Sequence, residues 1–260
     1  MKLLAFDLEI SRPFIEGEWR NKDLGISCIG LASVDGERRA AWTITDDAAR
    51  HGDCAMRSEG LDLFISALAN YAQSGYKIIS WNGLGFDFPM LYEYVEQKQL
   101  CKALALAHYD LAFQMFCAEG YMIGLDTAAR GMGLSGKLVG MSGKLAPPMW
   151  SGVDDAELAE SIEAQTDIKP GTLEAQEMVL KYVQQGAVTT LEVIEKANKL
   201  GYLGWTSRSG RSNTWLIAPK AKRIWEWGAL TVAECLALPE PDTSWMSDPR
   251  SRSDYAGWLE

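Results

Sequence analysis

Two acidic residues near the start of the chain have the spacing of a metal-binding pair. Asp7 and Glu9 lie two positions apart in segment 2–10, whose alternating apolar residues predict a β-strand, so both side chains point to the same side of a sheet. Two carboxylates this close repel each other unless a cation lies between them or one stays protonated. The alternative is a pair of solvated acids on an exposed edge strand. The apolar residues around them favour a central strand, and therefore a metal site.

A third acidic residue follows a second predicted strand. Residues 77–81 form a short apolar run that predicts a buried strand, and residues 82–89, with two glycines and a proline, predict a tight turn that opens a helix. Asp87 lies in this turn. An ordinary helix cap is the alternative to a metal ligand at this position, and the turn taken alone fits either role.

Taken together, these segments resemble the motifs of a known enzyme family. Segments 7–9 and 82–87, in this order, resemble the first two motifs of the DEDD 3′–5′ exonucleases, which have the RNase H-like fold. The resemblance is closest to the exonucleases related to the proofreading domain of family-B DNA polymerases. Segments 107–111 and 124–137 resemble two further stretches of that family, so the resemblance covers about residues 1–200.

The third motif of the family is altered in this chain. The family has a tyrosine followed four residues later by an aspartate on a late helix, and residues 173–199 predict such a helix. Tyr182 matches the tyrosine, but Gly186 stands where the aspartate is expected. No acidic residue between Glu177 and Glu192 replaces it. A glycine inside a helix costs about 1 kcal/mol relative to alanine, so it needs a reason. Close packing of the helix is one explanation for the glycine. The loss of a metal ligand is the other, and it is the one that we predict.

The resemblance implies hydrolysis at the 3′ end of a nucleic acid, with two divalent metal ions, Mg²⁺ or Mn²⁺, as cofactors. It implies that Asp7, Glu9 and Asp87 hold the ions. It also implies that Tyr182 orients the attacking water. With Gly186 in place of the fourth carboxylate, we expect slow hydrolysis or none. A catalytically inactive nucleic-acid-binding protein of the same fold is the alternative.

The charge distribution allows a nucleic-acid partner in spite of a net charge of −10. Segment 196–223 contains seven basic residues and no acidic one, so the charges are segregated along the chain. The residues predicted to bind nucleic acid are Asn82, Phe86, Lys137, Lys144, Arg208, Arg211, Lys220, Lys222 and Arg223. The tryptophans of this region, Trp205, Trp215, Trp225 and Trp227, either stack on bases or pack in the core as parts of a hairpin. We expect single-stranded DNA or a frayed 3′ end as substrate, with RNA as the alternative.

Three features bear on location and partners. The five cysteines form no CxxC pair, the N-terminus lacks the pattern of a signal peptide, and the apolar runs are shorter than the ~20 residues of a membrane helix. We therefore expect a cytoplasmic protein without membrane contact. Segment 238–260 predicts a poorly ordered or externally docked tail, through which a polymerase or another replication protein is a further expected partner.

The elements that must position these residues predict an α/β fold. The predicted strands are residues 2–10, 26–34, 39–45, 77–81 and 104–108. The predicted helices are residues 59–73, 86–97, 111–118, 124–132 and 173–199. Together they predict an RNase H-like mixed five-stranded sheet flanked by helices, with a mobile loop at 133–153. We divide the chain into an exonuclease domain, 1–200, and a basic and aromatic extension, 201–260, packed on or beside it. Asp110 is predicted to cap a helix and His108 to be structural.

Overall fold

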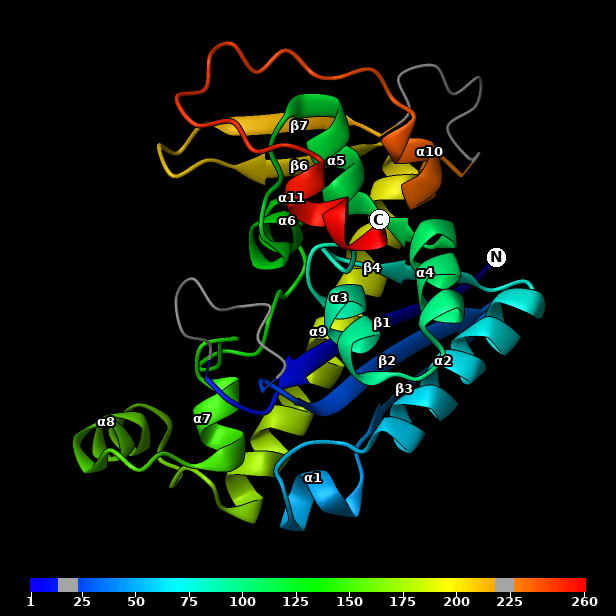
Figure 1. Cartoon of the computed structure of the whole chain (residues 1–260). Helices are drawn as coiled ribbons and strands as arrows, with labels where there is room; N and C mark the ends of the chain where they lie inside the picture. The colour runs from blue at the N-terminus through cyan, green and yellow to red at the C-terminus, as the bar shows by residue number, and fades with distance from the viewer. Residues whose placement is uncertain (14–22, 218–226) are drawn as a thin grey trace.

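The structure is a computed structural model that describes residues 1–13, 23–217 and 227–260. Some residues expected to contact nucleic acid lie outside the described residues, and these are Lys220, Lys222, Arg223 and Trp225. The described part contains a mixed five-stranded sheet with the strand order β3-β2-β1-β4-β5, and a separate two-stranded sheet (Figure 1).

The large sheet has the mixed topology that the sequence predicts. Its strands are β1 (Lys2–Ile10), β2 (Ile26–Asp35), β3 (Arg38–Ile44), β4 (Lys77–Ser80) and β5 (Tyr109–Asp110). Strand β2 runs antiparallel to both β1 and β3, whereas β1, β4 and β5 run parallel to one another. Because β1 lies at the centre, the acidic residues it carries are on a central strand, as their apolar surroundings indicate.

The alternation of side chains along β1 separates two hydrophobic clusters. Leu4, Phe6 and Leu8 belong to the cluster that includes the buried residues of helix α2 (Ser58–Gln73). Leu3 and Ala5 belong to the other cluster, which includes the second half of helix α9 (Leu173–Leu200). Since side chains along a strand point alternately to opposite faces, the odd-numbered acids of β1 share the α9 face.

Helices cover both faces of the sheet (Figure 1). Helices α2, α3 (Asp87–Tyr94) and α4 (Lys98–Ala107) pack together on one side, and α9 crosses β1 and β2 on the other. The remaining helices are α1 (Asp47–His51), α5 (Leu111–Glu119), α6 (Leu125–Gly131), α7 (Ala146–Ser151), α8 (Ala156–Thr166), α10 (Val232–Leu236), α11 (Ser253–Ala256) and the 3₁₀ helix η1 (Gly257–Leu259).

Helix α9 lies very close to the sheet because a glycine, which has no side chain, lies at the point of contact. Gly30 of β2 is the register partner of Asp7, and a Cβ atom on it would overlap the carbonyl oxygen of Val183 in α9. Backbone therefore packs directly against backbone at this crossing. The residues of α9 that follow Val183 are thereby held against the middle of β1.

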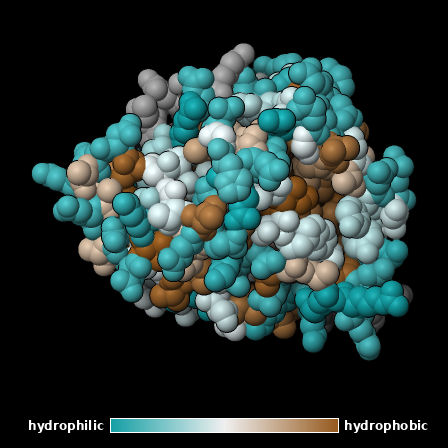
Figure 2. Space-filling view, turned by 90° about the horizontal axis from the view of Figure 1, so that it is seen from below, coloured by the Kyte–Doolittle hydropathy of each residue, from teal (hydrophilic) through white to brown (hydrophobic). Residues whose placement is uncertain are grey.

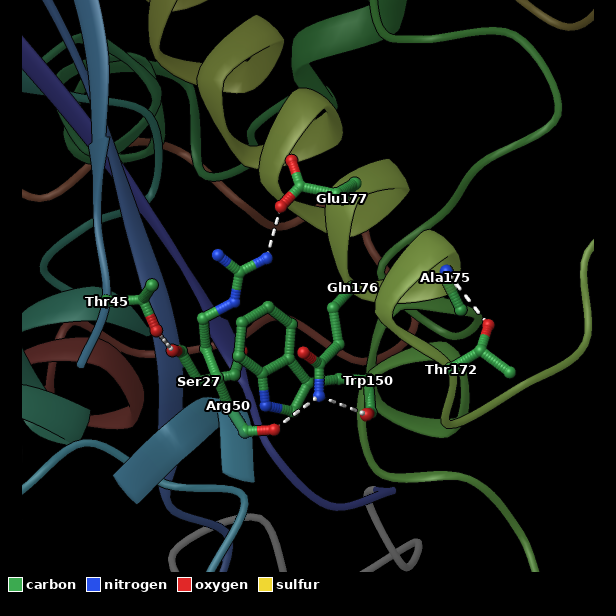
Figure 3. Close-up of polar contacts among 8 residues, drawn as sticks. All are labelled: Ser27, Thr45, Arg50, Trp150, Thr172, Ala175, Gln176 and Glu177. Atoms are coloured by element: carbon green, nitrogen blue, oxygen red, sulfur yellow. Dashed lines mark hydrogen bonds and ion pairs between the residues drawn. The ribbon is translucent and has the colours of Figure 1, made fainter. Parts of the chain in front are cut away.

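Side chains from three segments hold the first turns of α9 (Figure 3). Gln176 Nε2 donates to the backbone oxygens of Arg50, at 3.1 Å, and Trp150, at 3.5 Å. The guanidinium of Arg50 forms an ion pair with Glu177. The Thr172 side chain caps the helix by accepting a backbone hydrogen bond. These contacts join α1, α7 and α9, and so fix the direction in which α9 crosses the sheet.

Three of the predicted elements are wrong in part. Residues 104–108, predicted as a strand, belong to α4 apart from its cap residue 108, and the strand that follows is only Tyr109–Asp110. The short apolar run fits a strand and a buried helix equally, and the burial of Cys101 and Leu104 shows the helical period. The helix predicted over 86–97 ends at Tyr94. The loop predicted over 133–153 contains helix α7.

The C-terminal part begins with a hairpin of β6 (Tyr202–Thr206) and β7 (Ser212–Leu216). Trp205 and Trp215 of these strands are buried in the same hydrophobic cluster as α6 and α9, so the core alternative is correct for both. Segment 238–260 lies against the body of the protein and includes α11, so the docked alternative is correct for the tail (Figure 1). The division at residue 200 stays a prediction.

The face of the molecule seen from below is largely hydrophilic (Figure 2). On the face drawn in Figure 2, small apolar patches are separated by hydrophilic side chains. Among the described residues, no helix combines the length and the apolar character that crossing a membrane requires.

Candidate functional site

A pocket of about 720 Å³ lies where β1 meets the turn that leads into α3. Asp7, Glu9 and Asp87 all line it. Residues from the two predicted motifs, about 80 positions apart in sequence, therefore meet at one site. The strand and the turn bring them together because β1 and β4 are parallel neighbours, so the segment leaving β4 passes the end of β1.

The turn before α3 is held by one buried carboxylate. Asp110 accepts hydrogen bonds from the backbone nitrogens of Asn82, at 2.9 Å, and Leu84, at 3.1 Å. It also accepts one from Phe113 at 3.1 Å, and so caps α5 as the sequence predicts. Asn82 has a φ of 63°, a left-handed conformation that asparagine tolerates better than most residues. Asp110 thus positions the turn that carries Asp87.

Asp87 joins the turn to the central strand. Its Oδ1 accepts a hydrogen bond from the backbone nitrogen of Leu8 at 3.0 Å, and its side chain is 3% exposed. The N-cap of α3 is Phe86, so the capping role offered as an alternative for Asp87 does not apply. Burial raises the pKa of Asp87 well above its usual range, and the negative charge of Asp7 raises it further.

Asp7 faces position 186 directly. A Cβ atom on Gly186 would overlap Asp7 Oδ2, so the carboxylate occupies the space that a side chain at position 186 would need. Oδ2 is buried and has no hydrogen-bond partner within the described residues. Burial raises the pKa of Asp7. The glycine is therefore on the site-facing side of α9, where the family motif would place its aspartate.

Glu9 completes a group of three carboxylates with unfavourable charges. Its side chain is 6% exposed, and burial raises its pKa well above the usual range, with the charges of Asp7 and Asp87 adding to the increase. Carboxylates in such an arrangement are stabilised as anions only by a nearby cation. The electrostatics of the pocket thus favour the binding of positive charge.

One lysine already brings positive charge to the group. Lys137 Nζ donates to the Tyr182 hydroxyl at 3.3 Å and lies 5.2 Å from the centre of its ring. Burial lowers the pKa of Lys137, but the charges of Asp7, Tyr182 and Glu9 outweigh it, so that the pKa is raised overall. The backbone nitrogen of Lys137 donates to Asp126 at 3.1 Å, which fixes the loop. The structure therefore places Lys137 and Tyr182 in contact beside the acids.

The carboxylates fit a divalent metal ion in their chemistry but form an incomplete ligand set. Mg²⁺ and Mn²⁺ prefer oxygen ligands, and Asp7, Glu9 and Asp87 offer only oxygen. The unpartnered Oδ2 of Asp7 is free to bind a cation. In the part of the chain that the structure describes, however, no three His, Cys, Asp or Glu side chains are grouped closely enough to hold one ion.

The other predicted residues divide into two sets. Asn82, Phe86 and Lys144 line the pocket with the acids. Arg208 and Arg211 are exposed at the β6–β7 turn and are not among the residues that line it. The structure thus brings only the first set together with the carboxylates.

His108 is a structural residue, as the sequence predicts. It is 1% exposed, and its Nε2 lies 2.9 Å from Ser80 Oγ. Burial lowers its pKa to about 4, so the imidazole stays neutral near neutral pH.

Sequence reasoning missed the part of the tail that lines the pocket. Arg250, Asp254 and Tyr255 form one side of it. The only local signal was the composition of residues 250–255, in which three charged side chains and a tyrosine alternate with serines. Nothing in that composition indicates where the tail lies.

Comparisons with known proteins agree with the architecture. A family model described as the RNase_H superfamily matches residues 15–198. No curated protein matches the chain. A solved structure that matches is the zinc-bound form of the Escherichia coli ExoI–ssDNA complex, with 11% sequence identity and a TM-score of 0.28. The match covers 85% of this chain and 52% of that one, so the chain spans about half the length of that structure. The family match and the mixed sheet confirm the predicted fold class.

Proposed function

This chain belongs to the RNase_H superfamily, and from that premise we propose that it is a metal-dependent 3′–5′ exonuclease with reduced activity. In this proposal it hydrolyses phosphodiester bonds at the 3′ end of single-stranded DNA. The activity is reduced because Gly186 leaves the site one carboxylate short. The DEDD motif order and the likeness to proofreading exonucleases of family-B polymerases belong to the same proposal.

One observation carries the proposal. Asp7, Glu9 and Asp87 line one pocket, and Asp7 lies against Gly186 on α9. Burying three carboxylates together has a free-energy cost unless a cation neutralises them. Their presence in one pocket therefore requires a physical explanation. Binding of divalent ions beside a phosphodiester is a reason that explains all three at once.

Each residue of the site has its own role in the proposed reaction. Divalent ions bound by Asp7, Glu9 and Asp87 would activate a water molecule and neutralise charge at the scissile phosphate. In this proposal Tyr182, which is buried behind the residues that line the pocket, orients that water. Its hydroxyl accepts a hydrogen bond from Lys137 and keeps its own proton for another acceptor. Lys137 supplies a fixed positive charge beside the acids.

The walls of the pocket suit an unpaired strand. Phe86 and Trp81 line it and are half-buried, so each has an accessible aromatic edge or face for a base. Lys144 is exposed at the same pocket and suits a phosphate. RNA remains the alternative substrate. Contact of the strand with Arg208 and Arg211, a polymerase or replication partner and a cytoplasmic location stay predictions.

The decisive test restores the missing carboxylate. We expect Gly186→Asp to increase nucleotide release from the 3′ end, because it adds an oxygen ligand beside Asp7 once the carboxylate of Asp7 turns away from position 186. The gain should be at least the 10- to 100-fold that outer-shell partners of a metal site are worth. The measurement follows digestion of a 5′-labelled single-stranded oligonucleotide with Mg²⁺ or Mn²⁺, in which 3′–5′ action produces a descending ladder.

Gly186→Asn is the matched control for this experiment. Its side chain has nearly the same shape and meets Asp7 in the same way, but it lacks the negative charge. The control should stay at the level of the unchanged chain. Equal rates for all three proteins at saturating metal would contradict the role of position 186. Absence of any 3′-end release from the Asp variant would contradict the exonuclease proposal itself.

A second candidate is a catalytically inactive nucleic-acid-binding protein. The observation that favours it is the absence, among the described residues, of three closely grouped metal ligands. This candidate predicts oligonucleotide binding that is unchanged by EDTA, together with no digestion by either the chain or Gly186→Asp. The exonuclease proposal predicts binding that Mn²⁺ or Ca²⁺ strengthens.

A further inference from the structure

The C-terminal segment, residues 238–260, forms a wall of the acidic pocket. Arg250, Asp254 and Tyr255 of this segment line the pocket together with residues of β1. They lie 50 or more positions beyond the end of α9 in the sequence. The sequence motifs of the metal site therefore give no indication that this segment contributes a binding residue.

Specific hydrogen bonds hold this wall in place. The guanidinium of Arg252 donates to the backbone oxygens of Cys117, Leu236, Leu238 and Pro239, at 2.7–3.2 Å. Trp258 Nε1 donates to the backbone oxygen of Leu84 at 3.0 Å. The bonds to Cys117 and Leu236 join the segment to α5 and α10, and those to Leu238 and Pro239 fold the segment on itself.

The wall also contacts the turn that carries Asp87. A Cβ atom on Gly85 would lie 2.8 Å from Tyr255 Cδ1, so the tyrosine ring packs directly on the turn. The same ring packs against Phe116 with 4.7 Å between centroids. Tyr255 is therefore fixed from both sides, and the residues just before it have a defined place relative to the acids.

Arg250 is a free cation on this fixed wall. Its side chain is exposed, and within the described residues no hydrogen bond or ion pair engages it. Asp254, which lines the same pocket, instead accepts hydrogen bonds from the nitrogen and hydroxyl of Ser251. The guanidinium thus lies at an acidic pocket without being neutralised by it.

We infer that Arg250 binds a backbone phosphate of the nucleic-acid strand that enters the pocket. A guanidinium presents paired N–H donors that match two phosphate oxygens. Lys144, from the loop before α7, is exposed at the same pocket and engages no other group in the described part of the chain. The strand then has a cation from the tail and another from this loop at the pocket that the acids line. This inference rests on the proposed function.

The test measures binding rather than digestion. Anisotropy of a labelled single-stranded oligonucleotide is followed with EDTA present, over a series of salt concentrations. Arg250→Ala should weaken binding several-fold for every sequence and lower the slope of log affinity against log salt by about 0.7, the loss of one phosphate contact. Arg250→Lys should retain most of the slope. A merely structural role of Arg250 would leave the slope unchanged.

Arg38→Ala is the matched control. Arg38 is an exposed arginine of the edge strand β3 and takes no part in the pocket. If the unchanged chain binds and Arg250→Ala matches Arg38→Ala in affinity and slope, the inference about Arg250 is overturned while the proposed function stands. If the unchanged chain binds no oligonucleotide with EDTA but binds with Ca²⁺, the series is repeated with Ca²⁺ and the same outcomes apply. If it binds under neither condition, both are overturned.

Discussion

At the scale of single residues, the side chain of Asp7 and a side chain at position 186 would need the same space. The carboxylate of Asp7 fills the space that a side chain at position 186 would take, and its Oδ2 finds no partner there among the described residues. An unpartnered buried oxygen costs about 1–3 kcal/mol. Asp7 therefore faces backbone at position 186, with no side chain there to pair with it.

A second residue-scale consequence concerns His108. The pKa of the folded His108 is about 4, below the 6.5 of an ordinary histidine, so the unfolded chain takes up the proton first as the pH falls. Stability therefore decreases between pH 6.5 and 4 by on the order of 3 kcal/mol from this group. Urea unfolding across this range measures it.

The chain offers its own control, since it has only two histidines. The other, His51, is exposed. His51→Gln should keep the full decrease, whereas His108→Gln should lower stability at pH 7 but lose that part of the pH dependence. Identical pH profiles for both variants would mean that folding does not lower the pKa of His108.

At the scale of elements, the site depends on how close α9 comes to the sheet. Gly30 of β2 allows the backbone of α9 to touch the strand, and this crossing sets the position of both Tyr182 and Gly186. Gly30→Ala should destabilise the protein by about 1–3 kcal/mol or more, because the new methyl group meets backbone atoms that cannot move aside. The measurement is the free energy of unfolding in urea.

Gly60→Ala tests whether glycine replacement alone has this effect. Gly60 lies in α2, and a Cβ atom there would have only ordinary contacts, the nearest at 3.5 Å. We expect a neutral or stabilising change of up to about 1 kcal/mol, since alanine favours a helix. If Gly30→Ala and Gly60→Ala lose stability equally, the close crossing of α9 does not explain the effect of Gly30→Ala.

At the scale of the whole molecule, the tail closes the site by returning to it. Arg252 fixes the tail, so Arg252→Ala should release segment 238–260 and expose it to proteases, while the sheet stays folded. Limited proteolysis followed by mass spectrometry detects cleavage in this segment. The neighbouring variant Arg250→Ala should leave the cleavage pattern unchanged. Cleavage that is equal in both variants and the unchanged chain would mean that other contacts hold the tail.

The sequence alone determined the features that depend on short-range sequence patterns. The alternation of β1, the turn before Asp87 and the long period of α9 are short-range patterns, and they predicted the central strand, the turn and the long helix. The metal-binding role of the three acids and the lost ligand at Gly186 stay predictions. Where an apolar run was short, as at residues 104–108, the same reasoning mistook a helix for a strand.

Only the tertiary structure decided which distant groups meet. Lys137 contacts Tyr182 across 45 positions, Asp110 holds a turn 28 positions before it, and Arg250 reaches a pocket built from β1. Their places depend on how helices and tail pack on the sheet. Packing joins residues far apart in the chain through shape and burial, and no local pattern records it.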